Sequence, residues 1–122
     1  MRNHLEHDHQ KALFQWASHI PELEWMFAIP NGAVLAGDKG KRARQMNSLK
    51  ATGLKPGVWD IFLPVAKHGY HGLFIEMKAG KNTLSDKQED FGNNVHRAGY
   101  LTHTCYDWLE AKRVITDYMR FE

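Results

Sequence analysis

The sequence has little of several features that mark particular classes of protein. It contains one cysteine, Cys105, which excludes an internal disulfide and a cysteine-based zinc site. It has no apolar run near the ~20 residues that cross a bilayer, and its first residues lack the apolar segment of a secretory signal. The sequence therefore predicts a cytoplasmic protein that does not associate with a membrane.

A large excess of one charge is also absent, because 16 Lys and Arg residues are balanced by 14 Asp and Glu residues. The positive charge is nevertheless unevenly placed, since residues 39–55 contain several basic side chains and no acidic one. Such a segment would attract a phosphate backbone, although a solvated helix face is an alternative interpretation. The candidate DNA-binding residues are Lys41, Arg42, Arg44, Lys50 and Lys55.

Length and composition favour one small globular domain. A chain of 122 residues buries a single core, so residues 1–122 are expected to form one domain. Hydrophobic residues make up 43% and charged residues 25%, which is ordinary for a globular protein. No repeat, linker or low-complexity tract divides the sequence.

The most informative stretch combines an acid in one short apolar run with a Glu-x-Lys motif in the next. Asp60 follows Trp59, and Glu76 and Lys78 lie at the end of the second run. Side chains alternate along a strand, so Glu76 and Lys78 share one face with Phe74, while the apolar residues between them enter a core. Two carboxylates beside an ammonium suit a divalent-metal site in a phosphodiester-cleaving enzyme. A solvated face with a weak salt bridge is the alternative.

Turn residues predict that Asp60 and Glu76 lie close together. Turns that contain glycine and proline precede Asp60 and separate the two apolar runs, and such turns fold one strand back onto the next. The strands expected at 58–64 and 72–78 would pair as an antiparallel hairpin. This pairing would bring Asp60 near Glu76.

Apolar periodicity and capping residues predict the remaining elements. An apolar stripe marks the first helix, which stops at Pro21, and a capping box at Ser85–Gln88 begins a later helix. A turn is expected at Pro30-Asn31-Gly32 and a loop at 33–39. The expected elements are a helix at 4–19, a strand at 24–29, a helix at 41–52, strands at 58–64 and 72–78, a helix at 86–98, a strand at 100–106 and a helix from 107. This order predicts an α/β fold with a mixed β-sheet flanked by helices.

Several side chains are expected to have packing roles. Cys105 lies on the last expected strand together with His103, which is expected to be a packed or hydrogen-bonded polar residue rather than a general base, and Leu109 belongs to the apolar stripe of the last helix. Trp59 is expected to line a groove beside Asp60. The other tryptophans, Trp16, Trp25 and Trp108, are predicted to lie in the core.

In this order, the pieces resemble the virus-type replication-repair nuclease (VRR-NUC) domain, a branch of the PD-(D/E)xK nuclease superfamily. The resemblance runs from Leu5 to about Tyr118, and its ordered pieces are far more specific than Glu-x-Lys alone. They are Glu6 to Gln10 leading to Leu13 and Trp16, Ile29-Pro30-Asn31-Gly32, Gly53-Leu54-Lys55-Pro56-Gly57-Val58-Trp59-Asp60-Ile61, His71-Gly72-Leu73-Phe74-Ile75-Glu76-Met77-Lys78, Leu84-Ser85-Asp86-Lys87-Gln88, and Gly99-Tyr100. The resemblance implies a single restriction-endonuclease-like domain. The family usually has proline where this chain has Trp59, a change that should affect how the strand begins more than the chemistry.

The resemblance also implies a set of metal ligands. Asp60 and Glu76 would coordinate Mg²⁺ or Mn²⁺ together with the main-chain carbonyl of Met77. Glu6, on the first helix, matches the family's additional acidic ligand, and Asp8 is the alternative. An oxygen-rich site with few protein ligands leaves room for waters and phosphate oxygens, as magnesium requires.

Two further residues match catalytic positions of the family. Lys78 would orient or activate the attacking water and stabilise the developing charge, and Gln88 would place the substrate or the lysine. A histidine-based metal site at His7 and His9 is disfavoured, because side chains two apart on a helix diverge by about 200°.

The resemblance therefore implies a metal-dependent DNA endonuclease of a bacterial or phage-infected cell. Stand-alone members of the family look like homodimers that act on branched DNA such as four-way junctions, and a two-fold dimer supplies the paired sites for two symmetric cuts. Two alternatives stay open. One is a non-cleaving nucleic-acid-binding module of the same fold, and the other is a nicking or restriction-type nuclease with a different DNA preference.

Overall fold

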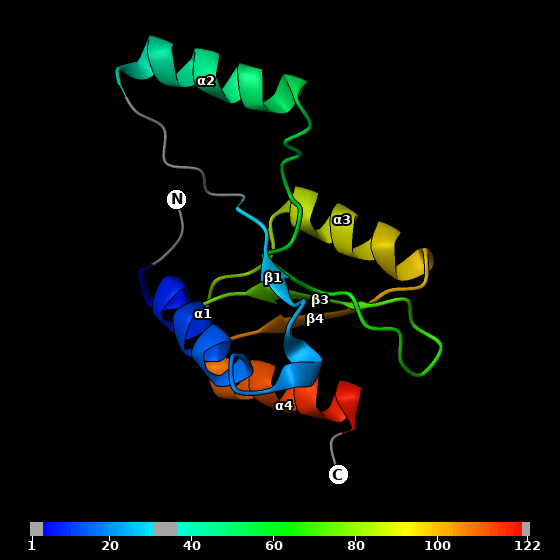
Figure 1. The fold of residues 1–122 in the computed structure, drawn as a ribbon. Helices are drawn as coiled ribbons and strands as arrows, with labels where there is room; N and C mark the ends of the chain where they lie inside the picture. Colours follow the sequence, from blue (N-terminus) through cyan, green and yellow to red (C-terminus); the bar gives the residue numbers. More distant parts are fainter. Residues whose placement is uncertain (1–3, 31–36, 121–122) are drawn as a thin grey trace.

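A four-stranded mixed sheet organises the chain (Figure 1). The computed structural model describes residues 4–30 and 37–120. Its elements are α1 (His4–Ala17), the 3-10 helix η1 (Pro21–Leu23), β1 (Phe27–Ala28), α2 (Lys39–Ala51), β2 (Ile61–Leu63), β3 (Leu73–Met77), α3 (Asp86–Arg97), β4 (Leu101–Cys105) and α4 (Trp108–Met119).

The strands follow one another across the sheet in the order β1-β2-β3-β4. The β1–β2 and β2–β3 pairs are antiparallel, and β3 and β4 are parallel. A parallel pair needs a crossover connection, which α3 supplies between β3 and β4. The predicted mixed sheet and the hairpin that precedes α3 are both confirmed.

Alternation along β3 separates the core face of the sheet from the face that carries Glu76. Leu73, Ile75 and Met77 are fully buried on the face that α1 and α4 cover (Figure 1). Burial of each such side chain contributes about 1.5–3 kcal/mol. The largest fully buried side chains are Leu13, Ile61, Leu63, Leu73, Ile75, Met77, Cys105 and Ile115.

Aromatic rings cover much of the opposite face of the sheet. Phe62 stacks on Phe74 with ring centroids 4.5 Å apart, and Tyr100 contacts both rings edge-on. Phe91 of α3 meets Phe74 at 5.2 Å, so α3 packs on this face through an aromatic contact. This face also carries Glu76, two residues along β3 from Phe74.

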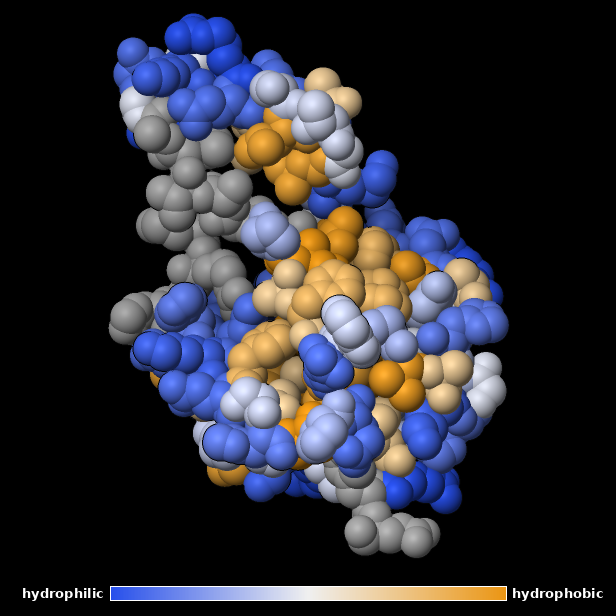
Figure 2. Space-filling model, viewed as in Figure 1, coloured by the Kyte–Doolittle hydropathy of each residue, from blue (hydrophilic) through white to orange (hydrophobic). Residues whose placement is uncertain are grey.

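Helix α2 stands apart from the rest of the fold (Figure 1). None of its residues is buried, because its sequence is polar and basic with no wide apolar stripe. The Asp38 carboxylate caps its N-terminus by accepting from the N–H of Lys41, and Gly53 follows its last turn with φ +115°. Figure 2 shows hydrophilic residues over most of its outer surface and apolar ones on the side towards the body.

Several expectations from the sequence are wrong. The strand predicted at 24–29 is reduced to two residues, because the 3-10 helix that begins at Pro21 ends at Leu23 and the turn that follows it takes up residues 24–25. Trp25 is 73% exposed and Leu109 is 58% exposed, so neither lies in the core. His103 is exposed on β4, an edge strand of the sheet.

Some boundaries also differ from the predictions. Lys39, assigned to a loop, is the first residue of α2, because Asp38 caps the helix there. Asn31 and Gly32 of the predicted turn, and residues 33–36 of the predicted loop, lie outside the described residues. No helix in the part of the chain that the structure describes is long and apolar enough to cross a membrane.

Candidate active site

Asp60 and Glu76 lie side by side at the end of the β2–β3 hairpin, just beyond the pair that Ile61 forms with Ile75. The main-chain N–H of Asp60 donates to Glu76 Oε1 over 3.1 Å, and the N–H of Met77 donates to Asp60 Oδ2 over 3.0 Å. This follows from the strand register, in which Ile61 lies opposite Ile75. Each acid is 6% exposed or less, so the predicted pair is buried and held by main-chain groups.

The electrostatics of this pair favour an added positive charge. Burial and the neighbouring charge of Asp60 raise the pKa of Glu76 to about 8, against the lowering effect of Lys78. Lys78 Nζ lies 3.6 Å from Glu76 Oε2. With only one ammonium beside them, ionisation of both buried acids leaves a net negative charge, which a bound divalent cation would offset.

Gln88 connects the first turn of α3 to the acids. Its Nε2 donates to Glu76 Oε2 over 3.0 Å, while its Oε1 accepts from the N–H of Ser85 over 2.9 Å. The Ser85 hydroxyl accepts in turn from the N–H of Gln88, so the predicted capping box is confirmed. The same side chain thus caps a helix and orients a candidate metal ligand.

Trp59 fixes α3 in this position. Its indole N–H donates to the carbonyl of Gln88 over 2.8 Å, and its ring lies against Gly92, where an added Cβ would lie 2.6 Å from Cζ2. Trp59 does not belong to the lining of the cleft that contains Asp60, so the expectation that it lines this groove is wrong, although it borders a separate pocket together with Gly92. Its role is structural, because it holds α3 over the sheet.

An open cleft of about 620 Å³ contains the site, with Asp60, Glu76, Lys78 and Gln88 in its lining. Met46 of α2 and Lys55 of the connector that follows α2 form part of its wall. The cleft therefore lies between α2 and the body of the fold, next to basic residues that a DNA backbone would contact.

The helix α1 brings one acid to this cleft. Glu6 is 7% exposed and lines the cleft, whereas Asp8 is exposed and does not belong to the lining. This placement favours Glu6 over Asp8 as the helix-borne acid. His9 accepts a hydrogen bond at Nδ1 from the N–H of Trp108, which gives it a packing role.

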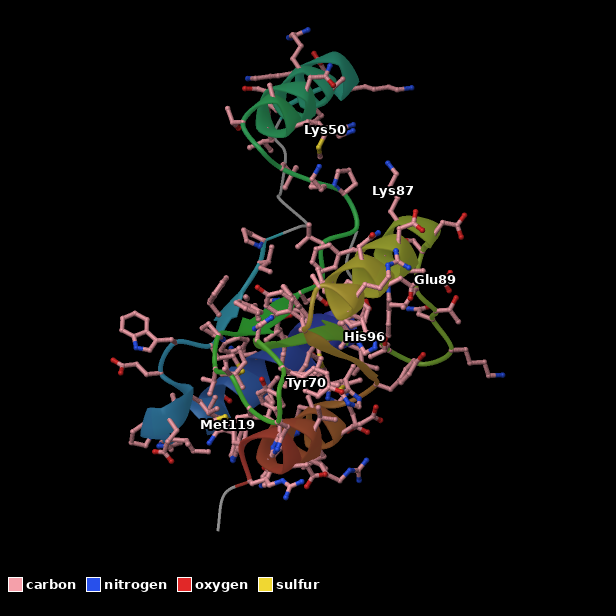
Figure 3. All side chains as sticks on the ribbon, turned by 90° about the vertical axis from the view of Figure 1, so that its right-hand side faces the viewer. Lys50, Tyr70, Lys87, Glu89, His96 and Met119 are labelled. Carbon is pink, nitrogen blue, oxygen red and sulfur yellow. The ribbon has the colours of Figure 1, made fainter. Side chains whose placement is uncertain are left out.

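Most of the basic residues predicted to bind DNA lie away from Asp60 and Glu76. Lys41, Arg42, Arg44 and Lys50 are exposed on α2, and of the predicted set only Lys55 lines the cleft. Arg42 donates from Nη1 to the carbonyl of Gly37 over 3.0 Å. Figure 3 shows Lys50 on α2 and Lys87 extending from α3 towards that helix.

Lys87 was not among the residues selected from the sequence. Its only sequence signal is its place directly before Gln88, in the first turn of a helix that begins shortly after the Glu76-x-Lys78 motif. The cleft also includes Met46 and Leu84, whose apolar character gave no indication of a site.

The donor set fits magnesium or manganese better than a metal that needs many protein ligands. Among residues 4–30 and 37–120, no group of three or more His, Cys, Asp or Glu side chains is arranged to hold a metal ion. The available donors are the carboxylates of Asp60 and Glu76 beside the main chain of Met77, and Glu6 lines the same cleft without forming a three-acid group with them. Magnesium is commonly bound through one or two carboxylates and several waters, so this small oxygen set is suitable.

Comparison with known proteins bears on the family and the fold. The profile of the VRR-NUC domain family matches residues 1–108. A solved structure of a VRR-NUC domain protein superposes with a TM-score of 0.80, covering 98% of this chain and 92% of the other, at 20% sequence identity. At that identity the likeness shows a common fold. No curated protein matches this chain.

Proposed function

Because the chain belongs to the VRR-NUC domain family, a nuclease family, we propose that it is a metal-dependent endonuclease that cuts branched DNA. The observation that carries this proposal is the meeting of Asp60, Glu76, Lys78 and Gln88 in one cleft. Three of these side chains are linked through Glu76, since Gln88 and Lys78 both approach Oε2 of that residue.

The proposed chemistry is hydrolysis of a phosphodiester with metal assistance. When bound between Asp60 and Glu76, Mg²⁺ or Mn²⁺ would supply a Lewis acid for the scissile phosphate. Lys78 is placed to stabilise negative charge that develops on the phosphate, because its ammonium reaches the cleft beside the acids. Gln88 keeps the Glu76 carboxylate in one orientation.

Helix α2 is the proposed main contact with the DNA backbone. Its exposed basic residues, together with Lys55 at the wall of the cleft, would bind phosphates on one side of the scissile bond. Binding should therefore weaken steeply with salt, because phosphate contacts release counterions. Replacement of Arg44 by Gln should reduce the slope of log K against log salt by about 1.

A homodimer is part of this proposal. One domain offers one catalytic cleft, whereas the resolution of a four-way junction needs two symmetric cuts, which a two-fold dimer supplies. The expected solution state is therefore a dimer that binds a four-way junction more tightly than a linear duplex. Light scattering reports the mass, and competition gel shifts report the preference.

The decisive experiment is a cleavage panel of linear duplex, flap, splayed-arm and four-way-junction DNA with Mg²⁺, Mn²⁺ or EDTA. The proposal expects cuts in branched substrates with either metal and none in EDTA, and Lys78→Ala should abolish them. A protein that binds these DNAs but cuts none would be a non-cleaving binding module. Equal cutting of duplex and branched DNA would support the nuclease activity but exclude a preference for branched DNA.

A further inference from the structure

A second pocket lies beside the cleft that contains the acids, between α3 and the connector that follows α2. It has a volume of about 320 Å³ and shares Lys55 and Pro56 with the cleft. Its lining residues are Lys55, Pro56, Lys87, Asp90, Phe91 and Asn94. A strand that leaves the catalytic cleft over the Lys55–Pro56 connector would enter this pocket next.

The pocket is formed by a close contact between the connector and α3. Gly57 has φ +92°, and a Cβ there would lie 2.6 Å from the carbonyl oxygen of Lys87, so glycine lets the two backbones touch. This contact brings Lys55 next to Lys87. Since neighbouring helical side chains point about 100° apart, Gln88 reaches the acids while Lys87 extends towards α2 (Figure 3).

The pocket combines an apolar floor with a charged rim. Phe91 and Pro56 supply the apolar surface, and the rings of Phe91 and Phe74 lie 5.2 Å apart at an interplanar angle of 89°. Lys55 and Lys87 place two ammonium groups at the rim, and both residues are exposed. Aromatic floors stack nucleobases and lysines bind phosphates.

Two polar residues complete the lining. Asp90 is exposed, so its carboxylate is available to accept from the N–H groups of a base. Asn94 is held by its own bonds, since its Nδ2 donates to the carbonyl of Asp90 over 2.7 Å and its Oδ1 accepts from Arg97 over 2.9 Å. A carboxylate would repel a bare phosphate, so this side of the pocket suits a base edge and the lysine rim suits the phosphate.

We propose that this pocket binds one unpaired nucleotide of the DNA strand that crosses the catalytic cleft, with its base on Phe91 and its phosphate between Lys55 and Lys87. The proposal rests on the nuclease function above and extends it, because it gives a physical reason for a preference for branched DNA. A base in a duplex is stacked on both faces and lies beyond the reach of a side pocket. Flaps, splayed arms and open junctions offer unpaired bases without that cost.

The test separates the base from the phosphate. The probes are a fluorescent duplex with a short single-stranded thymine flap and the same duplex with an abasic flap, which retains the phosphates. Binding is measured by fluorescence anisotropy in EDTA, so no cleavage occurs. Stacking of one base on an aromatic ring strengthens binding by about 5- to 150-fold, so the wild type should bind the thymine flap at least about fivefold more tightly.

Two variants and a control assign the effect to the pocket. Phe91→Leu keeps an apolar side chain and should remove the difference between the two flaps. Lys87→Gln should weaken the binding of both flaps to the same extent, because it removes the ammonium that would contact the phosphate. Arg113→Gln makes the same charge change on α4, on the other side of the sheet, and should leave the affinity for both flaps unchanged. Circular dichroism melting checks that each variant is folded.

Either of two results overturns the proposal: the wild type binds both flaps equally, or a folded Phe91→Leu protein keeps the full difference. The outcome is independent of the nuclease proposal. A protein that cuts branched DNA yet ignores the missing base disproves the pocket alone. A protein that discriminates between the flaps but cuts nothing with Mg²⁺ disproves the nuclease function alone.

Discussion

Asp60 and Glu76 hold each other in place through the main chain. The N–H of Asp60 donates to Glu76 Oε1 over 3.1 Å, while the Asp60 carboxylate accepts from the N–H of Met77, the neighbour of Glu76, over 3.0 Å. The orientation of each acid is thus fixed before any metal binds. Such preorganisation is expected of a site that stabilises charge during a reaction.

Removal of either negative charge should stop catalysis. Asp60→Asn and Glu76→Gln keep the size of the side chain, so DNA binding through α2 should be almost unchanged. Loss of a partner that only orients a metal ligand costs about 10- to 100-fold, and loss of a ligand should exceed about 100-fold in cleavage rate. Single-turnover cleavage and gel shifts measure the two quantities, and substantial cutting by Asp60→Asn would refute the assignment.

Two variants should distinguish a catalytic role of Gln88 from its role in capping α3. Gln88→Glu retains an oxygen for the N–H of Ser85 but replaces the donor to Glu76 with a negative charge, so activity should fall by about 10- to 100-fold. Ser85→Ala removes the cap and should cost about 1 kcal/mol of stability with little change in rate. Urea unfolding and cleavage assays distinguish them. Equal activity losses in the two variants would show that Gln88 acts only through the helix.

Glu6 should matter more to cleavage than Asp8. Glu6 is buried and lines the cleft, whereas Asp8 is exposed outside it. Glu6→Gln should lower the cleavage rate by about tenfold or more, as loss of a metal-site partner does, and Asp8→Asn should leave it close to wild type. The matched pair removes one charge from the same helix. A larger effect of Asp8→Asn would mean that the helix-borne acid is misassigned.

The metal-free protein should lose stability as the pH rises. The pKa of Glu76 is about 8 in the folded protein and about 4.5 ordinarily, so the folded state binds the proton more tightly. Stability from this group is therefore greatest below about pH 4.5 and declines towards pH 8, where the folded carboxyl also ionises. Thermal melts in EDTA should show this decline, and Glu76→Gln should abolish it.

The same pKa predicts how metal affinity depends on pH. Mg²⁺ must displace the proton of Glu76, so its apparent affinity should rise between about pH 6 and pH 8 and level off above. Calorimetric titrations at several pH values measure this. A flat profile across that range would show that Glu76 is already ionised in the folded protein.

Two glycines should respond to alanine in opposite directions. Gly92→Ala places a Cβ 2.6 Å from the Trp59 ring and should destabilise the protein by about 1–3 kcal/mol. It should also slow cleavage, because displacement of α3 moves Gln88. Gly40→Ala, in α2, meets no atom nearer than 3.6 Å and should stabilise that helix by up to about 1 kcal/mol. A Gly92→Ala protein with the stability of the wild type would show that the contact between Gly92 and Trp59 is not tight.

The sequence by itself determined the features that depend on neighbouring residues. Alternation along β3 put Glu76 and Lys78 on one face, turn residues produced the hairpin that brings Asp60 to Glu76, and the Ser85–Gln88 capping box began α3. Each of these rests on local geometry over a few residues or on a short connection, and local geometry can be read from spacing and residue type.

Only the tertiary structure decided which distant segments meet. Trp25 is 73% exposed although its segment is rich in apolar residues, so its place outside the core depends on how the elements pack. The bond from Gln88 to Glu76 and the approach of Lys55 to Lys87 depend on where α3 packs, which Trp59 and the close contact at Gly57 fix. Such contacts join residues far apart in the chain, and their geometry is set by side-chain packing in the whole fold, which no local spacing encodes.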